Sequence, residues 1–290
     1  MCVKLYQLIL NADDFGRHVL INRAVELGVS EGCLRSATLM PGGAAFDDAV
    51  AVAKRQPKLG VGIHFTLVNG NPILPPSAIP SLVDRNGLFY DNHAIFVKRF
   101  LTGKISIEEV RSELAAQLTK MRRTGLELTH VDSHQHMHTL PGIIDVVLQL
   151  AASAKIRAVR APRTSVFYRG SGVPSLGQFI GRLGLGTLAS ISALKAERHH
   201  FFVPDHFAGI VAGEAFDESH LVDLLHHLKS GTTEVMLHPG MENETLQRDC
   251  AWEHDFKAEF SSITSIKIRE IIDKNKIHLI NFKDLFEDVL

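Results

Sequence analysis

Short runs of apolar and β-branched residues alternate with longer amphipathic segments along most of the chain. The short runs are typical of buried strands, and the longer segments repeat their apolar residues at helical spacing. The predicted strands cover residues 3–10, 36–40, 60–64, 128–132, 158–161, 234–238 and 278–282. The predicted helices cover residues 19–29, 46–55, 107–123, 141–154, 218–229 and 263–274. A strand followed by a helix, repeated in this way, predicts parallel strands joined by crossover helices.

Polar residues stand at the ends of five of the predicted strands. In parallel α/β folds, the loops that follow the strands gather the residues that carry the chemistry. Such ends would converge on one mouth in a barrel, whereas an open sheet collects ligands only where its strand order reverses. The pattern therefore favours an α/β fold with a single β/α barrel, complete or incomplete, of seven or eight strands. The polar ends are residues 11–16, His64, and residues 132–138, 160–163 and 238–240.

No internal repeat or linker interrupts this pattern, so we expect one domain over residues 1–290 with two insertions. The first, near residues 68–100, begins with a stretch rich in Pro and Asn that should form a loop beside the mouth and shape the substrate pocket. The second, near residues 165–200, repeats apolar residues at roughly helical spacing, and these could dock on a membrane surface or cover the barrel. They are Phe179, Ile180, Leu183, Leu188, Ile191 and Leu194.

The composition narrows the classes of partner. The chain has 290 residues, 45% of them hydrophobic, so it can bury a large core, and disorder is excluded as its main state. A formal net charge of −1 gives no overall field to attract nucleic acid or an anionic membrane. The three cysteines lie far apart without a CxxC spacing, which favours a reducing compartment. With no leader pattern and no run of roughly 18 apolar residues, we expect a cytoplasmic location.

Histidine is abundant, with 16 residues, and imidazole suits both metal binding and proton transfer near neutral pH. An ion that activates water needs few protein ligands, so that positions remain for water and substrate. One carboxylate from the adjacent Asp13 and Asp14, together with His64 and His134, meets this need from three strand ends. Each also has a structural interpretation, because aspartates cap helices and a lone histidine in an apolar strand often packs in the core. Their shared position makes them a candidate divalent-metal site.

Two further questions concern the residues beside these ligands. Because Asp13 and Asp14 are adjacent, their side chains point in different directions, and one could bind metal while the other faces the bound water. His134, His136 and His138 cannot all be ligands if the site is to stay open. His134 is closest to the strand end and is the favoured ligand, which leaves His136 and His138 as orienting groups or substrate contacts.

Other strand ends supply supporting groups. Asp132 could hold an imidazole in one tautomer, or simply cap its strand. Arg160 and Arg163 could pair with a catalytic carboxylate, bind a substrate oxygen, or form surface salt bridges. His238 follows a strand of buried character and is the candidate general acid.

Four blocks of the sequence resemble the signature motifs of the YdjC-like carbohydrate deacetylases, and they follow in the family order along the chain. They are NADDFG at residues 11–16, GIHFTL at 62–67, HVDSHQHMH at 130–138 and EVMLHPG at 234–240. The resemblance implies a β/α barrel related to polysaccharide deacetylases, a homodimer, and removal of acetyl groups from N-acetylglucosamine units. It implies a divalent ion of the Mg²⁺ type, with Zn²⁺ or Mn²⁺ as alternatives. It also implies that Asp14, His64 and His134 bind this ion and that Asp13 is the general base.

The resemblance points to two substrates. Residues 71–89 and 157–163 are similar to the branch of the family associated with hopanoid biosynthesis, which implies a glucosaminyl lipid and peripheral contact with the inner membrane face. The block at residues 132–136 is instead similar to members that act on diacetylchitobiose. Other functions also stay open on the residues alone: a phosphoesterase or another amidohydrolase with the same ligands, or a sugar-binding protein without catalysis.

Overall fold

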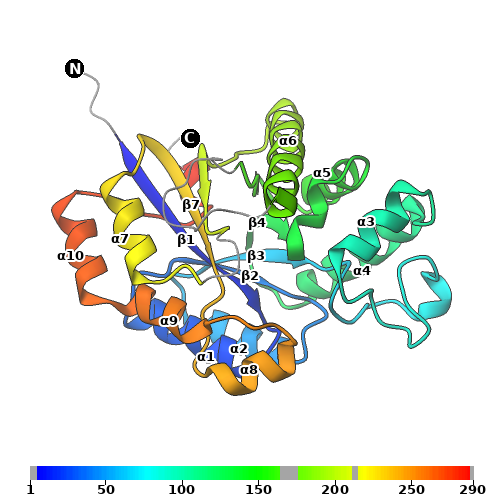
Figure 1. Cartoon of the computed structure of the whole chain (residues 1–290), viewed down its shortest axis with the longest axis horizontal. Coiled ribbons are helices and arrows are strands. Elements are labelled where there is room, and N and C mark those ends of the chain that lie inside the picture. The colour runs from blue at the N-terminus through cyan, green and yellow to red at the C-terminus, as the bar shows by residue number, and fades with distance from the viewer. Residues whose placement is uncertain (1–4, 164–175, 211–214, 288–290) are drawn as a thin grey trace.

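The computed structural model of the chain describes residues 5–163, 176–210 and 215–287. A parallel sheet curls through the centre in the strand order β5-β4-β3-β2-β1-β7-β6, and β8 pairs with β1 beside this path. Helices surround the sheet on its outer side (Figure 1). This architecture confirms the predicted α/β fold with an incomplete barrel. The strands are β1 (Tyr6–Phe15), β2 (Ser36–Leu39), β3 (Gly60–Phe65), β4 (Leu128–Ser133), β5 (Ala158–Val159), β6 (His206–Ala208), β7 (Gly231–Leu237) and β8 (His278–Leu279).

The helices follow the predicted order with some additions. They are α1 (Val19–Ser30), α2 (Phe46–Arg55), α3 (His93–Leu101), α4 (Ile107–Arg123), α5 (Ile143–Ser153), α6 (Leu176–Arg198), α7 (Glu218–His226), α8 (Asn243–Cys250), α9 (Phe256–Thr264), α10 (Ile266–Lys274) and α11 (Asp284–Glu287), with the short 3₁₀ helices η1 (Pro76–Ala78) and η2 (His134–Thr139). The prediction of one helix over residues 263–274 is wrong. Ser265 is extended, and its hydroxyl accepts the backbone N–H of Ile268, so α9 ends there and α10 begins.

The central strands separate an apolar outer side from a polar inner side. Successive side chains of a strand face opposite sides of the sheet. On β1, Leu8 and Leu10 join the main hydrophobic cluster under the helices, whereas Ile9 lies in a separate small cluster and Asn11 shares its side of the strand. The neighbouring strands repeat this alternation. Their buried polar side chains include Thr38, His64, His130, Asp132 and Glu234.

The two ends of the strand order approach each other. An isolated parallel bridge joins Ala158 of β5 to Phe202, four residues before β6, and the Val159 N–H donates to the Phe202 carbonyl at 3.0 Å. Ile9, Ala158 and Phe282 pack together at the amino end of the strands. The inside of the barrel is therefore filled by apolar side chains at one end, and its polar residues lie toward the carboxyl ends of the strands.

The two insertions differ in how they are held. In the first, the buried Glu113 of α4 accepts the backbone N–H groups of Ile73 at 2.8 Å and Leu74 at 2.9 Å. The second falls partly outside the described residues, and the side chains of Phe179, Ile180 and Leu183 are among those not described. In the described part of α6, Ala189, Ser192, Ala193 and Ala196 are buried, while Ile191 and Leu194 are exposed. Among the described helices, none combines the length and apolar character needed to cross a membrane.

The close packing on the inner side of the sheet constrains residue 62 to glycine. A Cβ atom there would lie 2.5 Å from the ring of His130, which is stacked on Phe282 at 3.7 Å between ring centroids. We expect Gly62→Ala to lower the free energy of unfolding by about 1–3 kcal/mol, as overpacking does in tight cores. Urea denaturation measures this change. Gly184→Ala is the matched control, because Gly184 lies exposed in α6 with nothing near its missing Cβ and should be neutral or stabilising. Equal stabilities of the two variants would contradict the prediction.

Candidate active site

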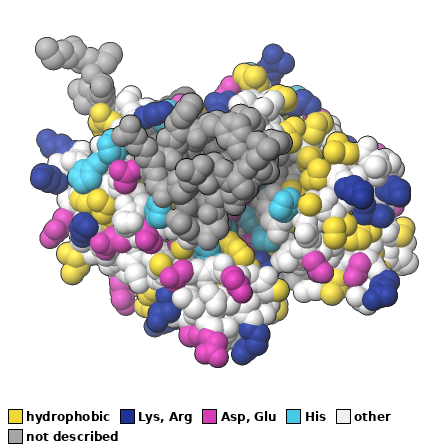
Figure 2. All heavy atoms as spheres, viewed as in Figure 1, with side chains coloured by type: hydrophobic (Ala, Val, Ile, Leu, Met, Phe, Trp, Pro, Cys, Tyr) yellow, Lys and Arg dark blue, Asp and Glu magenta, His cyan; other side chains and the backbone are white. Residues whose placement is uncertain are grey.

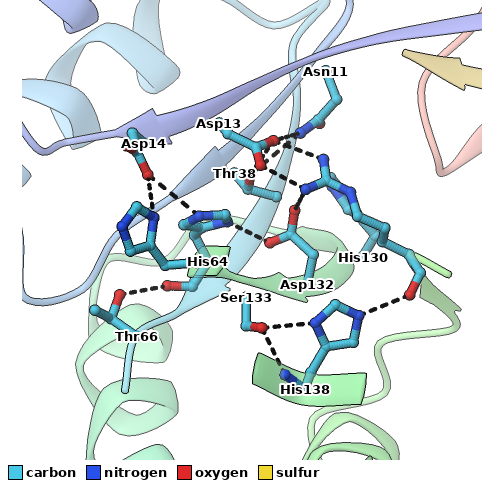
Figure 3. Close-up of polar contacts among 12 residues, drawn as sticks. Asn11, Asp13, Asp14, Thr38, His64, Thr66, His130, Asp132, Ser133 and His138 are labelled. Carbon is cyan, nitrogen blue, oxygen red and sulfur yellow. Dashed lines mark hydrogen bonds and ion pairs between the residues drawn. The ribbon is translucent and has the colours of Figure 1, made fainter. Parts of the chain in front are cut away.

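The end of β1 carries a local distortion that brings both aspartates to the inner side. The pairing of β1 with β2 shifts register between Ala12 and Phe15, and Asp14 lies in the left-handed region at φ 58°. Regular extended backbone would turn Asp13 and Asp14 to opposite sides of the sheet. In the distorted strand Asp13 lies toward Asn11 and Thr38, and Asp14 lies toward His64 (Figure 3). The expected division of the pair between two tasks therefore has a structural basis.

Asp14, His64 and His134 converge on one point. The Asp14 Oδ1 atom lies 2.9 Å from Nδ1 of His134 and 3.4 Å from Nε2 of His64, and all three side chains are buried. Within the described part of the chain, Asp14 Oδ1 nevertheless makes no hydrogen bond of acceptable geometry. Ligand atoms of the three residues lie within 4.8 Å of one another. Atoms that approach a common centre without pairing well with each other fit a bound cation, and one carboxylate with two imidazoles suits several divalent ions.

Asp132 orients the His64 ring from behind. The Asp132 Oδ1 atom lies 2.7 Å from Nδ1 of His64, which leaves Nε2 directed toward Asp14. Burial alone would lower the pKa of His64, but the carboxylates of Asp132, Asp14 and Asp13 outweigh it and raise this pKa to about 10. A carboxylate that fixes the remote ring nitrogen of a ligand histidine is a recurrent arrangement in metal sites. The contact with Nδ1 is the one that a tautomer-holding role of Asp132 would require in metal-bound protein.

Arg160 connects the carboxylates of three strands and is fully buried. Its guanidinium donates to both oxygens of Asp13, at 2.6 and 2.7 Å, and to Glu234 at 2.6 Å, and it lies 2.7 Å from Asp132. Burial raises the pKa of Asp13, but Arg160 lowers it further than burial raises it. The predicted substrate contact through Arg160 is therefore wrong, because its side chain has no exposed surface. The alternative, pairing with the candidate catalytic carboxylate, is what the structure has.

The remaining predicted substrate contacts occupy different environments. Both ring nitrogens of His138 are used within the protein, by the Ser133 hydroxyl at 2.7 Å and the Arg160 carbonyl at 3.0 Å, so the predicted substrate contact is wrong. His136 lies on η2, and its buried Nδ1 has no hydrogen-bond partner among the residues that the structure describes. Arg163 forms a partly exposed ion pair with Glu197 of α6 at 2.7 Å. Of these residues, His136 keeps a polar atom available for a ligand.

His238, the candidate acid, lies half-buried at the end of β7. Its backbone N–H donates to the buried carboxylate of Glu259, and its ring lies perpendicular to the ring of Trp252, with centroids 4.9 Å apart. Burial lowers the pKa of His238, and the carboxylates of Glu259, Asp13 and Asp14 oppose this shift. His238 thus follows β7, the strand that pairs with β1, whose end carries both aspartates.

Sequence reasoning missed a second arginine at the site. Arg17 donates to Asp14 Oδ2 at 2.9 Å and to the Cys250 carbonyl at 3.1 Å, and it also donates to the side chain of Asn69. It therefore joins the end of β1 to the first insertion and to the end of α8. Trp252, two residues beyond the end of α8, was missed as well. Two features of the sequence could have identified these residues: Arg17 directly follows a polar strand end, and Trp252 is the only tryptophan of the chain.

The electrostatic surroundings extend to the surface. Histidine side chains gather near the middle of the molecular face in Figure 2, which is viewed as in Figure 1. Glu234, below Arg160, has its pKa raised to about 7 because burial outweighs the attraction of the guanidinium. The site therefore combines a carboxylate paired with Arg160, three residues that could hold a metal ion, and an imidazole directly after a separate strand. These are the parts that hydrolysis with a bound divalent ion requires.

Comparisons with known proteins cover nearly the whole chain. A family model described as YdjC-like protein matches residues 7–274. A carbohydrate deacetylase of Brevibacillus brevis is 30% identical over 280 residues, which cover 96% of this chain and 99% of the relative. One of Clostridium beijerinckii is 28% identical over 284 residues, which cover 96% and 100%. The crystal structure of an Enterococcus faecalis protein named for cellobiose-phosphate cleavage is 25% identical, with a TM-score of 0.72 over 97% of this chain and 99% of that one.

The arrangement of Asp132 predicts the metal affinity of a variant. Asp132→Asn should weaken binding of Mg²⁺, Mn²⁺ or Zn²⁺ by about 10–100-fold, because the His64 ring loses the carboxylate that fixes it. Titration calorimetry on chelator-treated protein measures the affinity. Glu234→Gln is the matched control, since Glu234 also pairs with Arg160 but no hydrogen bond or ion pair joins it to His64 in the described residues. Similar losses in both variants would mean that Arg160, and not the His64 contact, accounts for the effect.

Proposed function

Since this chain belongs to the YdjC-like protein family, we propose that it is a metal-dependent hydrolase that removes the acetyl group from an N-acetylglucosamine-type sugar. One observation carries the proposal: the buried Asp14, His64 and His134 converge beside a second carboxylate, Asp13, that Arg160 holds in place. The names of the curated relatives, carbohydrate deacetylases in both cases, support the choice of an acetylated sugar. Amide hydrolysis needs both a base for water and an acid for the amine, and the site contains a candidate for each.

Asp14, His64 and His134 would hold the ion, which when bound polarises the acetyl carbonyl and makes a water molecule more acidic. Asp13 accepts the proton of the attacking water. Its lowered pKa keeps it ionised at neutral pH, and its two contacts with Arg160 fix its orientation. His238 donates a proton to the departing amine. Because burial lowers the pKa of His238, its protonated form is a stronger acid than a free imidazolium.

The choice of ion and of substrate forms part of the proposal. We take Mg²⁺ as the ion and regard Mn²⁺ and Zn²⁺ as the alternatives that a metal screen decides between. A carboxylate and two imidazoles with open positions support a range of divalent ions. For the sugar, a chito-oligosaccharide is the first candidate on the basis of residues 132–136, and a glucosaminyl hopanoid is the second candidate on the basis of residues 71–89 and 157–163. A cytoplasmic homodimer completes the proposal.

The role of Asp13 can be tested without removing the metal ligands. Asp13→Asn should reduce kcat for acetate release by about 100- to 10,000-fold, because the attacking water loses its base. Acetate is measured by an enzyme-coupled assay, and the metal content of each variant is measured in parallel. Glu234→Gln serves as the control, since it removes another carboxylate from Arg160 without removing the base. Full activity of Asp13→Asn with normal metal content would rule out Asp13 as the base.

The reaction class is tested by following two products. We expect acetate, and no phosphate, from assays that offer diacetylchitobiose, an N-acetylglucosaminyl lipid and a phosphorylated disaccharide in parallel. Activity should disappear with a chelator and return with added Mg²⁺. Phosphate release would establish the phosphoesterase alternative. Saturable sugar binding without either product, in protein with its metal restored, would establish a binding protein.

A further inference from the structure

We infer that the indole of Trp252 forms an aromatic platform for the sugar ring whose nitrogen receives the proton from His238. This inference rests on the proposed deacetylase function and names the part of the site that recognises the substrate. Trp252 lies between α8 and α9 and is 37% exposed, whereas its neighbours His254 and Phe256 are buried. A large aromatic side chain that stays accessible beside a candidate catalytic group needs a functional explanation more than an isolated surface residue does.

The platform is held by other rings. The Trp252 ring stacks on the His254 ring, with centroids 4.1 Å apart and planes 19° apart. The Phe256 ring stands almost perpendicular to it at 5.5 Å. Because His254 covers one face of the indole, the exposed surface belongs to the other face and the ring edge. His254 therefore supports one face of the indole, and the other face is available to stack on a ligand.

Glu259 links this platform to the candidate acid. One oxygen of the buried Glu259 lies 3.2 Å from Nε2 of His254 and accepts the backbone N–H of Phe216 at 2.8 Å. The other accepts the backbone N–H of His238. His254, which supports the indole, and His238 are thereby anchored to one carboxylate. A platform and an acid that share an anchor keep a constant separation, and a ligand loses less affinity to the ordering of a preorganised site.

A second tie connects Trp252 to the metal candidates. Ala251 lies in the left-handed region at φ 50°, and the Trp252 N–H donates to the Gln247 carbonyl at 3.2 Å, so the chain turns sharply after α8. Directly before this turn, the Cys250 carbonyl accepts from Arg17, which also donates to Asp14. Trp252 is therefore held in a defined position relative to both the candidate acid and the candidate metal ligands.

The chemistry of an aminosugar fits this position. The nitrogen that leaves as an amine is attached directly to a carbon of the sugar ring, so that ring must lie within about one ring width of the acid. The Trp252 and His238 centroids are 4.9 Å apart. The negative face of an aromatic ring attracts polarised C–H groups, which a pyranose presents on its flat faces, while its hydroxyl groups stay at the edge for polar contacts. A planar stacking surface distinguishes a sugar amide from an acyclic one.

His238, His254 and Glu259 could instead form a second cation site, because their ligand atoms lie within 4.8 Å of one another. Their existing contacts argue against this interpretation. Each Glu259 oxygen already accepts a backbone N–H group, so the carboxylate is held by the protein chain itself. We therefore assign Glu259 and His254 as positioning residues and Trp252 as the residue that contacts the sugar.

Because Trp252 is the only tryptophan, the intrinsic tryptophan emission of the full-length protein reports on this residue alone. Titration with the deacetylated disaccharide chitobiose, a product that is not turned over, should give a saturable change in this emission. N-methylacetamide, which has the amide but no ring, should give no such change at the same concentrations. An unchanged emission with chitobiose, in protein that releases acetate from diacetylchitobiose, would overturn the platform while the proposed function stands.

Kinetics of two substitutions provide the second readout. Trp252→Leu should raise KM for diacetylchitobiose about tenfold or more with a smaller effect on kcat, because it removes a stacking contact and not a proton carrier. Trp252→Phe keeps an aromatic face and should recover much of the loss, which also guards against a variant that fails to fold. An unchanged KM in Trp252→Leu would overturn the inference. Saturable emission changes without acetate from any sugar would instead contradict the deacetylase and leave the sugar platform in place.

Discussion

The active site depends on the ion pairs that the buried guanidinium of Arg160 makes with carboxylates. Three carboxylates from β1, β4 and β7 surround it, and none of them could remain charged inside a barrel without a partner, because burying an unpaired charge costs far more than folding normally leaves available. The pairing also has a directional effect. It holds Asp13 in one orientation, and through Asp132 it extends to the ring of His64. Removing the positive charge would therefore disturb the base and a metal ligand together.

Much of the fold follows from local patterns in the sequence. Short runs rich in apolar and β-branched residues located the predicted strands, even though the inner side of these strands carries polar residues such as His64, Asp132 and Glu234. β6 was not predicted because its three residues begin with a histidine and lie between Pro204 and Gly209, which interrupt the apolar run around them. The split between α9 and α10 was missed for a different reason: Ser265 interrupts an otherwise continuous helical pattern through a single side-chain bond. Short elements and caps depend on individual contacts that periodicity does not reveal.

The candidate site likewise contains residues that the sequence could predict and residues that it could not. Asp14, His64 and His134 could be proposed because parallel strands bring their carboxyl ends together, whatever the details of packing. The role of Arg160 could not be distinguished, because a guanidinium at a strand end is equally compatible with substrate and with buried carboxylates. His138 was misassigned because its buried contacts with Ser133 and the Arg160 carbonyl depend on a turn with left-handed residues. Trp252 lies in a loop, and loops have no regular sequence pattern from which the positions of their residues can be predicted.

The pairing of β8 with β1 has a consequence for the biosynthesis of the protein. β1 is the earliest described strand to leave the ribosome, and its partner on one side, at Gln7 and Leu8, is the latest. Phe282, next to this late strand, stacks on His130 inside the barrel. The nascent chain therefore carries β1 without this partner, and the His130 ring of β4 without Phe282, until residues 278–282 have been translated. Contacts between distant parts of a chain form slowly, and exposed strand edges favour aggregation in the interval. The pairing of β8 with β1 and the stacking of Phe282 on His130 can therefore form only after the other described strands have been synthesised.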